Sequence, residues 1–409
     1  MTRAALTREA PAYRDGTIRR PPPGIGGVVV GGDYQGLGIA RSLGQQGVPV
    51  VVLDDERSIA GASRYVDRHH RVPSLREPGT TLEALRSACT RWQLHGWVLY
   101  PTREETVAAI TDNRAELAEL FRVPTPAPAS VTPAWDKRQT YRLAERLGIP
   151  TPRSWFPAGE ADLTAVDLSS PVVVKPAIKE HFFYKTRVKA WRADDHAELV
   201  AAYRRASAIV GPGEVIVQEL VPGGGEGQLA FCCLFKQQEV LAGMTVGRRR
   251  QHPSDFGRAS TFVETIDLPE LEELSTRFLS AIDYYGLVEL EYKRDPRDGR
   301  LKLLDVNART WGYHSLGRTA GVDFSYLLFR DQVGLPVAPV RARVGARWIR
   351  LATDVPNAVR DIRAGTLRPA DYVRSLRGVD TEAVFSVRDP LPGLYELALL
   401  PYLAVRRGL

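Results

Sequence analysis

The sequence predicts a two-part chain, with a parallel, doubly wound α/β region followed by an α+β region. From Gly27 to about Pro126 apolar runs alternate with helix-like stretches, at a spacing typical of parallel sheets. Beyond that point short strands, hairpins and helices are mixed. The chain has 409 residues, which is enough for two or three domains. We therefore expect a flexible tail over residues 1–26, domains over 27–127 and 128–340, and a basic C-terminal extension over 341–409.

Composition narrows the class of protein. The chain is 44% apolar and 25% charged, as in ordinary globular domains. Its three cysteines are too few for a disulfide scaffold, which favours a reducing, cytoplasmic location. Two of them, Cys232 and Cys233, are expected on opposite faces of one strand. No apolar leader or membrane-length run is visible, and the formal charge of +7 comes without any nucleic-acid-binding signature.

The first region alternates strand and helix in a regular order. Strands are predicted over 26–32, 48–55 and 97–102, where valine-rich runs end in glycine, acid or threonine. Helices are predicted over 34–47, 77–96 and 103–121. The Pro-rich stretch 124–133 is expected to be a linker or domain entry.

The turn after the first strand, GGDYQGLG, resembles a dinucleotide-binding fingerprint only superficially. A G-x-G-x-x-G spacing that begins at Gly31 requires glycine at position 33, where Asp33 stands. A start at Gly36 puts Arg41 at the third place. A nicotinamide-dependent oxidoreductase would rest on this stretch alone, so a tight strand-to-helix crossing is the better prediction.

The second region opens with a capped helix. Asp136 is the expected N-cap, and Gly148 with Pro150 ends the helix. A strand is then expected over 169–177, a basic–aromatic stretch over 180–192 and a helix over 194–210. Residues 214–235 are expected to contain a strand that runs into a glycine-rich bend, followed by a further apolar run.

An acidic hairpin, GLVELEYKRDPRDGRLKLLDVNARTWG, carries the most informative chemistry. If Arg297, Asp298 and Gly299 form a three-residue loop, Glu291 faces Asp305, with opposed Cβ atoms about 5 Å apart. A two-residue loop would send these acids to opposite faces. Facing carboxylates repel unless a cation lies between them, and oxygen ligands select Mg²⁺ or Mn²⁺. A solvent-facing acidic hairpin is the alternative.

Further candidates are weaker when taken singly. Lys175 ends a buried strand, where an ammonium group needs an anion. Lys137 lies near a helix N-terminus, which also favours anions. The glycine-rich bend VPGGGEGQ has backbone groups that can bind a base, and the Glu226 carboxylate can accept hydrogen bonds from ribose hydroxyls. Surface lysines and an ordinary turn are the alternative interpretations.

Taken in order, these motifs resemble the ATP-grasp superfamily over residues 27–335, including the Rossmann-like domain that precedes the ATP-grasp domain. The matching stretches are DKRQTYRLAERLGIPTP, VVVKPA, VQELVPGGGEGQ and the acidic hairpin. The stretch that continues to SLGRTAGVDFSYLLFRD looks most like the carbamoyl-phosphate-synthase-like branch of predicted carboxylate–amine ligases.

The resemblance implies a role for each matched residue. Lys137 and Lys175 would hold the ATP phosphates, with Lys185 and Lys189 of a lid as further contacts. The adenine would be bound by the backbone around Gln218, Glu219, Leu220 and Val221, and the ribose would be bound by Glu226. Glu291, Asp305 and Asn307 would bind Mg²⁺, and Arg309 would face the transferred phosphoryl group. Asp305 departs from the glutamate more common in the family.

A second basic stretch, TVGRRRQHPSDFGRAST, resembles a segment near the site in this branch. It makes Arg248 and Arg250 candidates for a phosphate or a substrate carboxylate, since guanidinium groups bind planar anions in two places. A solvated charged turn is the alternative.

The resemblance implies an ADP-forming ligase that joins a small-molecule carboxylate to an amine through an acyl phosphate. The homodimers common in the family would be compatible with it. A kinase-like or carbamate-forming enzyme and a non-catalytic nucleotide sensor remain alternatives.

Overall fold

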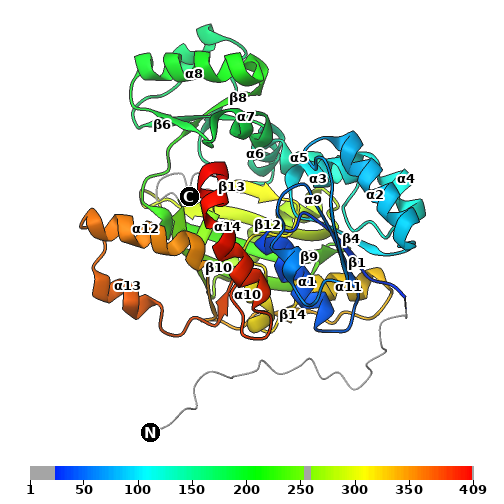
Figure 1. The fold of residues 1–409 in the computed structure, drawn as a ribbon. Coiled ribbons are helices and arrows are strands. Elements are labelled where there is room, and N and C mark those ends of the chain that lie inside the picture. Colours follow the sequence, from blue (N-terminus) through cyan, green and yellow to red (C-terminus); the bar gives the residue numbers. More distant parts are fainter. Residues whose placement is uncertain (1–23, 253–258, 408–409) are drawn as a thin grey trace.

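A computed structural model describes residues 24–252 and 259–407 of the chain. Most of the predicted tail, residues 1–23, lies outside the described part. Figure 1 shows a large central sheet, an α/β unit beside it, and a small α+β unit above it.

The N-terminal unit is a four-stranded parallel sheet in the order β3-β2-β1-β4. This confirms the predicted parallel architecture. One strand, β3, was not predicted, because all four of its residues are exposed and polar and give no apolar run. The elements are β1 (Gly27–Val30), α1 (Tyr34–Gly44), β2 (Val50–Asp54), β3 (Arg68–Arg71), α2 (Pro78–Trp92), β4 (Val98–Pro101), α3 (Glu104–Asp112) and α4 (Arg114–Leu120).

The glycine-rich turn between β1 and α1 is a tight crossing, as predicted. Asp33 caps α1, and its carboxylate accepts from the Tyr34 N–H. Gly31 has φ +103°, and a Cβ added there would lie 2.2 Å from the Thr102 hydroxyl. The Gly32 N–H donates to Asp54 at 2.8 Å, so backbone packing accounts for these glycines.

The small unit above the central sheet is a four-stranded sheet in the order β5-β8-β6-β7. Part of the predicted Pro-rich linker is helical instead, as α5. Pro128 begins that helix, where its missing N–H costs nothing. The elements are α5 (Pro128–Trp135), α6 (Lys137–Arg146), β5 (Ser154–Trp155), β6 (Val172–Pro176), α7 (Lys179–Thr186), β7 (Trp191–Ala193), α8 (His196–Val210) and β8 (Val215–Glu219).

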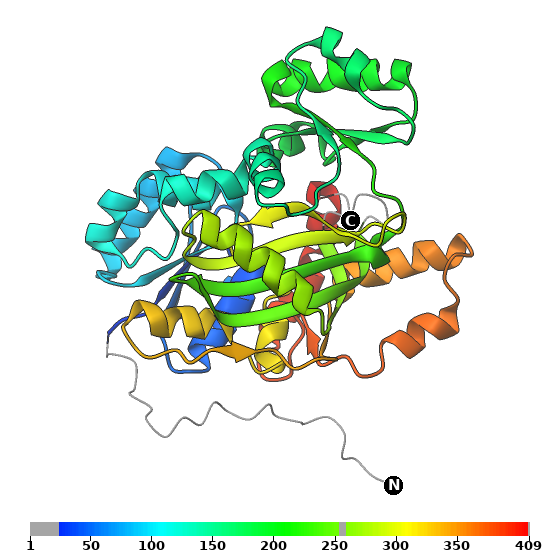
Figure 2. The same ribbon diagram turned by 180° about the vertical axis from the view of Figure 1, so that it is seen from behind.

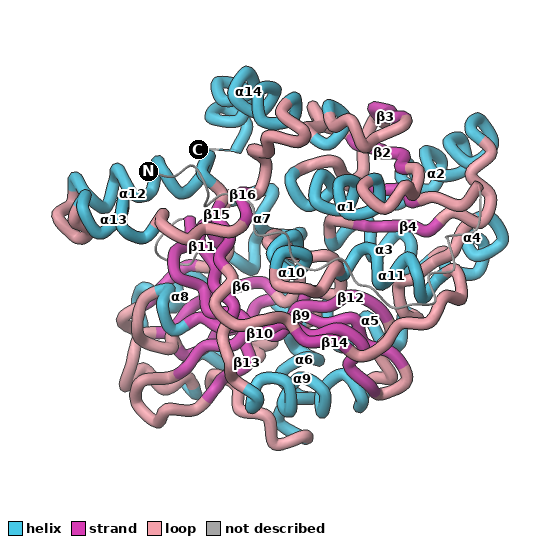
Figure 3. The backbone as a smooth tube through the Cα atoms, turned by 90° about the horizontal axis from the view of Figure 1, so that it is seen from below, coloured by secondary structure: helices cyan, strands magenta, loops and turns pink. Residues whose placement is uncertain are grey.

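The central sheet runs β13-β12-β9-β10-β11-β15-β16, with β14 paired to β10. Cys232 and Cys233 lie on opposite faces of β9, as predicted, and belong to different apolar cores. Helix α9 covers one face (Figure 2), and the N-terminal unit packs with α10 and α11 on the other (Figure 3). The elements are β9 (Gln228–Lys236), β10 (Glu239–His252), β11 (Ala259–Thr265), α9 (Pro269–Ala281), β12 (Gly286–Arg294), β13 (Leu301–Asn307), α10 (Ser315–Thr319) and α11 (Phe324–Gln332).

The C-terminal residues are part of the central sheet rather than an appendage to it. Two of their strands, β15 and β16, continue the sheet beyond β11. The C-terminal residues also contact the N-terminal unit, where Arg41 forms an ion pair with the buried Asp389 at 2.9 Å. The elements are β14 (Val340–Arg341), β15 (Arg347–Ile349), α12 (Leu351–Arg363), α13 (Pro369–Ser375), β16 (Thr381–Glu382) and α14 (Leu391–Arg407).

Candidate active site

The β12–β13 hairpin places its acids as predicted, although its loop is one residue longer. The Asp295 N–H donates to the Arg300 carbonyl, which leaves residues 296–299 as the loop, with Gly299 at φ +73°. A β-bulge at Leu304 then offsets the extra residue. Glu291 therefore faces Asp305 directly across the two strands, and Glu289 faces Asn307.

Asp305 is held by the ammonium group of Lys137, which donates to one carboxylate oxygen. Lys137 is the first residue of α6, whose N-cap is Asp136, as predicted. Burial raises the pKa of Asp305, but the charge and hydrogen bond of Lys137, together with the charges of Lys179 and Lys189, lower that pKa to about 2. The two residues therefore form a fully charged pair at the edge of the hairpin.

Glu291 faces two further cations. An Nη of Arg248, from β10, lies 3.2 Å from a Glu291 carboxylate oxygen. Burial opposes ionisation of Glu291, yet Arg248 and then Lys189 bring its pKa below the ordinary value. Burial in turn lowers the pKa of Lys189 to about 8, against the attraction of Glu291. Arg248 and Lys189 thus belong to the same charged cluster as the hairpin acids.

Asn307 and Arg309 continue the cluster toward the N-terminal unit. The Asn307 amide donates to Glu289 at 3.0 Å and to Glu291 at 3.2 Å. An Nη of Arg309 donates to the Asn307 side-chain oxygen at 3.2 Å. The Nε of Arg309 lies 2.7 Å from the carboxylate of Glu104, the first residue of α3.

Lys175 approaches the same place from the small sheet. Its ammonium group donates to Tyr141 Oη and to Gln218 Oε1, both at 2.7 Å. The Tyr141 hydroxyl donates to the carbonyl of Leu304, next to Asp305. The small sheet and the hairpin are thus joined at the position where the two predicted phosphate lysines converge.

The chain is similar in sequence to curated ligases. The chain is 24% identical over 238 residues to the D-aspartate ligase of Enterococcus faecium (strain Aus0004), which covers 55% of this chain and 56% of the relative. It is 29% identical over 212 residues to the D-alanine–D-alanine ligase of Pseudomonas entomophila (strain L48), covering 48% and 62%. The matched part is thus less than two thirds of either relative. No family model matches the chain.

Solved structures extend the likeness to most of the chain. Biotin carboxylase from Campylobacter jejuni superposes with a TM-score of 0.64 at 14% identity, over 79% of this chain and 74% of that one. An L-amino acid ligase from Bacillus licheniformis gives 0.57 at 18% identity, over 76% and 74%. This chain has the ATP-grasp fold.

The predicted adenine segment, Gln218–Val221, comprises the end of β8 in the small sheet and the start of the link to β9 in the central sheet, and we call it the hinge. Lys293 of β12 donates to the carbonyls of Val221 and Gly223, at 2.9 and 2.6 Å. Glu219 is held by Lys302 at 2.7 Å. The side chain of Glu226, the predicted ribose contact, lies outside the described residues.

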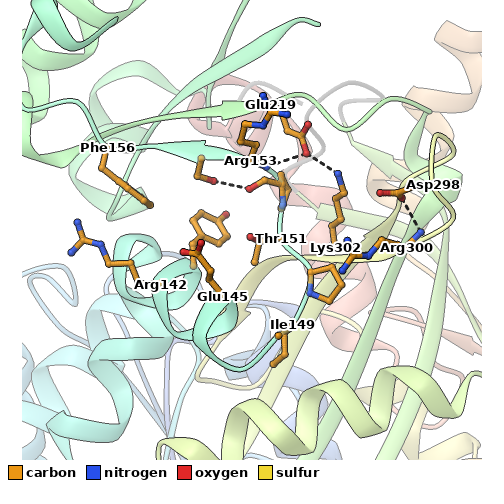
Figure 4. Close-up of a pocket in the computed structure, with 15 residues that line it drawn as sticks. Arg142, Glu145, Ile149, Thr151, Arg153, Phe156, Glu219, Asp298, Arg300 and Lys302 are labelled. Atoms are coloured by element: carbon orange, nitrogen blue, oxygen red, sulfur yellow. Dashed lines mark hydrogen bonds and ion pairs between the residues drawn. The ribbon is translucent and has the colours of Figure 1, made fainter. Parts of the chain in front are cut away.

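A pocket of about 480 Å³ borders this hinge (Figure 4). It lies between α6, β5 and the β12–β13 hairpin, and in Figure 4 Glu219 and Lys302 point toward one another along its wall. Tyr141, the hydrogen-bond partner of Lys175, also lines it. Glu289, Glu291 and Asp305 do not line this pocket, so the space flanks the hinge rather than the charged cluster.

Two predicted residues are not brought to the cluster. The Lys185 ammonium group donates to the Ile209 carbonyl of α8, on the far side of the small sheet. Arg250 forms a two-pronged ion pair with the buried Asp354 of α12, at 2.8 Å for both contacts. The spacing of Arg248 and Arg250 did not reveal this, because a β-bulge interrupts β10 between them.

Other cluster residues were missed from the sequence. Tyr313 donates its hydroxyl to Glu289, which is 4% exposed. Burial, together with the charge of Glu291, raises the pKa of Glu289 to about 7. The alternation of β12, which places Glu289 and Glu291 on one face, was the available signal for Glu289. Neither Tyr313 nor Glu104 had such a signal, since long-range packing brings them in.

The donor set of the hairpin fits a hard divalent cation. Glu291, Asp305 and Asn307 offer oxygen atoms on one face, and Mg²⁺ prefers such ligands. Within residues 24–252 and 259–407, no group of three or more His, Cys, Asp or Glu side chains could hold a metal ion. A cation at this hairpin would therefore depend on two carboxylates, one amide and oxygens of a bound ligand.

Proposed function

We propose that the chain is an ATP- and Mg²⁺-dependent ligase that joins a carboxylate to an amine, with release of ADP and phosphate. The observation that carries the proposal is the charged cluster on the β12–β13 hairpin. Asp305 and Glu291 face one another, each with a cation of its own, and Arg309 lies beside Asn307. Four basic side chains then surround two carboxylates, which suits a site for phosphate groups and a divalent cation.

The names of similar proteins support this class of reaction. Both curated relatives are named as ligases of amino acids, and one similar structure is that of an L-amino acid ligase. Solved structures with the same fold include complexes with ADP and with MgADP. We infer that an amino acid is one of the two substrates of this chain.

The chemistry requires activation of the carboxylate, because its oxide is a poor leaving group. Transfer of the γ-phosphoryl group of ATP to a carboxylate oxygen releases ADP and gives an acyl phosphate. The amine nitrogen then attacks the acyl carbon, phosphate leaves, and the nitrogen loses a proton. Catalysis of this kind depends mainly on positioning and charge neutralisation.

The residues of the cluster divide these tasks. Lys137 and Lys175 bind the phosphates of ATP, with Lys189 as a further contact. Arg309 neutralises the phosphoryl group in transfer, and Arg248 binds a phosphate or a substrate carboxylate. Glu291, Asp305 and Asn307 hold Mg²⁺, which when bound supplies positive charge to the phosphate oxygens. The lysines and arginines that now pair with the acids would then turn to the phosphates.

Water must be excluded, since it hydrolyses an acyl phosphate. We propose that the segment that contains α7 and Lys189 excludes water from the site. Charges on this segment act on the hairpin acids, because Lys179 and Lys189 both help to lower the pKa of Asp305. Closure of this segment over bound ATP would bring both lysines to the phosphates.

The test is a screen of D- and L-amino acids in pairs for ADP release, with mass detection of the product. We expect ADP and phosphate release that needs both an acid and an amine and stops when EDTA removes the metal. Release of AMP and pyrophosphate would rule out the acyl phosphate. ADP release that needs the acid but no amine would indicate a kinase-like enzyme instead.

A further inference from the structure

Helix α14 presents apolar side chains to the outside of the molecule. Leu391, Leu394, Tyr395, Leu397 and Leu400 are exposed, and Leu394 is 60% exposed. Val387, just before the helix, is 98% exposed. We call these six residues the α14 surface. Single exposed apolar residues are common, but several of them on one helix form an apolar surface that marks an interaction site.

The other side of α14 packs against the body of the protein. Leu399 is 3% exposed and belongs to the main apolar core. Glu396 is 1% exposed and pairs with the buried Arg350 at 2.7 Å. Glu396 is the sole charged residue in the sequence from 391 to 405, and its side chain is buried.

The surroundings of the α14 surface are basic. Arg57 is exposed and its guanidinium lies 5.3 Å from the centre of the Tyr402 ring. The exposed Arg64 lies near the start of the helix, because its backbone N–H donates to Asp389. Arg388 is exposed between Val387 and Asp389. Two of the nearby acids, Asp389 and Glu396, are buried in ion pairs with Arg41 and Arg350.

The charge around the α14 surface indicates which kind of partner binds there. A symmetric pair of chains would bring two basic surroundings of the same sign together, which is unfavourable. An anionic lipid surface offers acyl chains to the leucines and phosphates to the arginines. We propose that α14 docks this protein onto an anionic lipid bilayer, with the helix lying in the interface. No helix among the described residues is long and apolar enough to cross a membrane, which agrees with an interfacial position.

The test is flotation of the full chain with vesicles of phosphatidylcholine, alone or mixed with phosphatidylglycerol. The variant Leu391→Ser/Leu394→Ser/Leu397→Ser removes apolar contacts from the α14 surface. The matched control is Val355→Ser/Val359→Ser/Val373→Ser, which changes three exposed valines on α12 and α13. A second variant, Arg57→Gln/Arg64→Gln, removes flanking charge. None of these residues belongs to the proposed active site, so the outcome is independent of the ligase reaction.

We expect the unchanged chain and the valine control to float with the phosphatidylglycerol vesicles. The leucine variant should bind at least about tenfold more weakly. The arginine variant and added salt should weaken binding as well. Absence of flotation by the unchanged chain, or equal loss in the valine control, would overturn the proposal. A dimer of the unchanged chain that the leucine variant splits would instead assign the surface to a second copy.

Discussion

The guanidinium group of Arg309 lies 2.7 Å from the carboxylate of Glu104, so the N-terminal unit supplies a side chain to the charged cluster. Glu104 is almost fully buried, and burial raises its pKa despite the attraction of Arg309. A buried carboxylate with this partner fixes the position of the guanidinium group. Arg309 is thus oriented by Glu104 on one side and by Asn307 on the other.

The variant Glu104→Gln should lower kcat about tenfold, with a smaller effect on the KM for ATP. The amide keeps the shape of Glu104 but loses the charge that orients Arg309, and a tenfold loss corresponds to about 1.4 kcal/mol. Steady-state ADP release measures both constants. The matched control is Glu116→Gln, which changes an exposed glutamate of α4 that pairs with Arg86. Equal activity of the two variants would contradict the role of Glu104.

The two arginines of β10 should behave differently. Arg248→Gln should reduce turnover at least about tenfold, because it removes a cation from Glu291. Arg250→Gln should instead lower the free energy of unfolding by about 2–4 kcal/mol, since it leaves Asp354 buried without its ion-pair partner. Chemical denaturation and ADP release, measured on both variants, separate the two effects. Loss of turnover in a fully folded Arg250→Gln chain would show that Arg250 acts in the active site.

A pair of lysine variants tests the phosphate contacts. Lys175→Met should raise the KM for ATP at least about tenfold, because it removes an ammonium group that the hinge and Tyr141 hold in place. Lys185→Met should change that KM less than about twofold, since its ammonium group faces the Ile209 carbonyl. Titration of ATP in the ADP-release assay gives both values. A larger effect at Lys185 would contradict the assignment of phosphate contacts.

A buried histidine should make folding depend on pH. Burial lowers the pKa of His314 to about 4, so the folded state binds fewer protons than the unfolded state between pH 6.5 and 4. The contribution of His314 to the free energy of unfolding is therefore complete above pH 6.5. It falls by up to about 3 kcal/mol as the pH drops toward 4. Denaturation midpoints of His314→Gln should fall less steeply between pH 7 and 5 than those of the unchanged chain.

The exposed His95 provides the control for this comparison. His95→Gln should leave the steep dependence on pH intact. Parallel curves for the unchanged chain and His314→Gln would show that His314 does not contribute.

Much of the fold was predictable because its elements are local and periodic. Strands β1 and β2 are valine-rich runs, β4 is a short apolar run, and α6 has its cap at Asp136 and its stop at Gly148. The facing acids were predictable because strand alternation fixes a side, although the loop is longer than expected and the bulge at Leu304 corrects the register. Local pattern thus determined both the helices and the relation of Glu291 to Asp305.

The remainder depends on contacts between distant segments. Strands β15 and β16 have three and two residues, too few for a periodic pattern, so the sequence suggested a separate extension. Glu104 reaches the cluster through packing of the N-terminal unit against the central sheet, and Tyr313 reaches it from the loop between β13 and α10. The partner of Arg250 comes from α12, which no motif connects to β10.

Mg²⁺-dependent ADP release by the Asp305→Asn variant tests the central claim most directly. Asp305 is the acid held by Lys137 and opposed to Glu291, and the amide removes its charge with little change in shape. Asp298→Asn, in the exposed turn of the same hairpin, is the matched control. The account predicts a loss of at least about 100-fold for Asp305→Asn and a change below about twofold for Asp298→Asn. Unchanged turnover in a folded Asp305→Asn chain would contradict it.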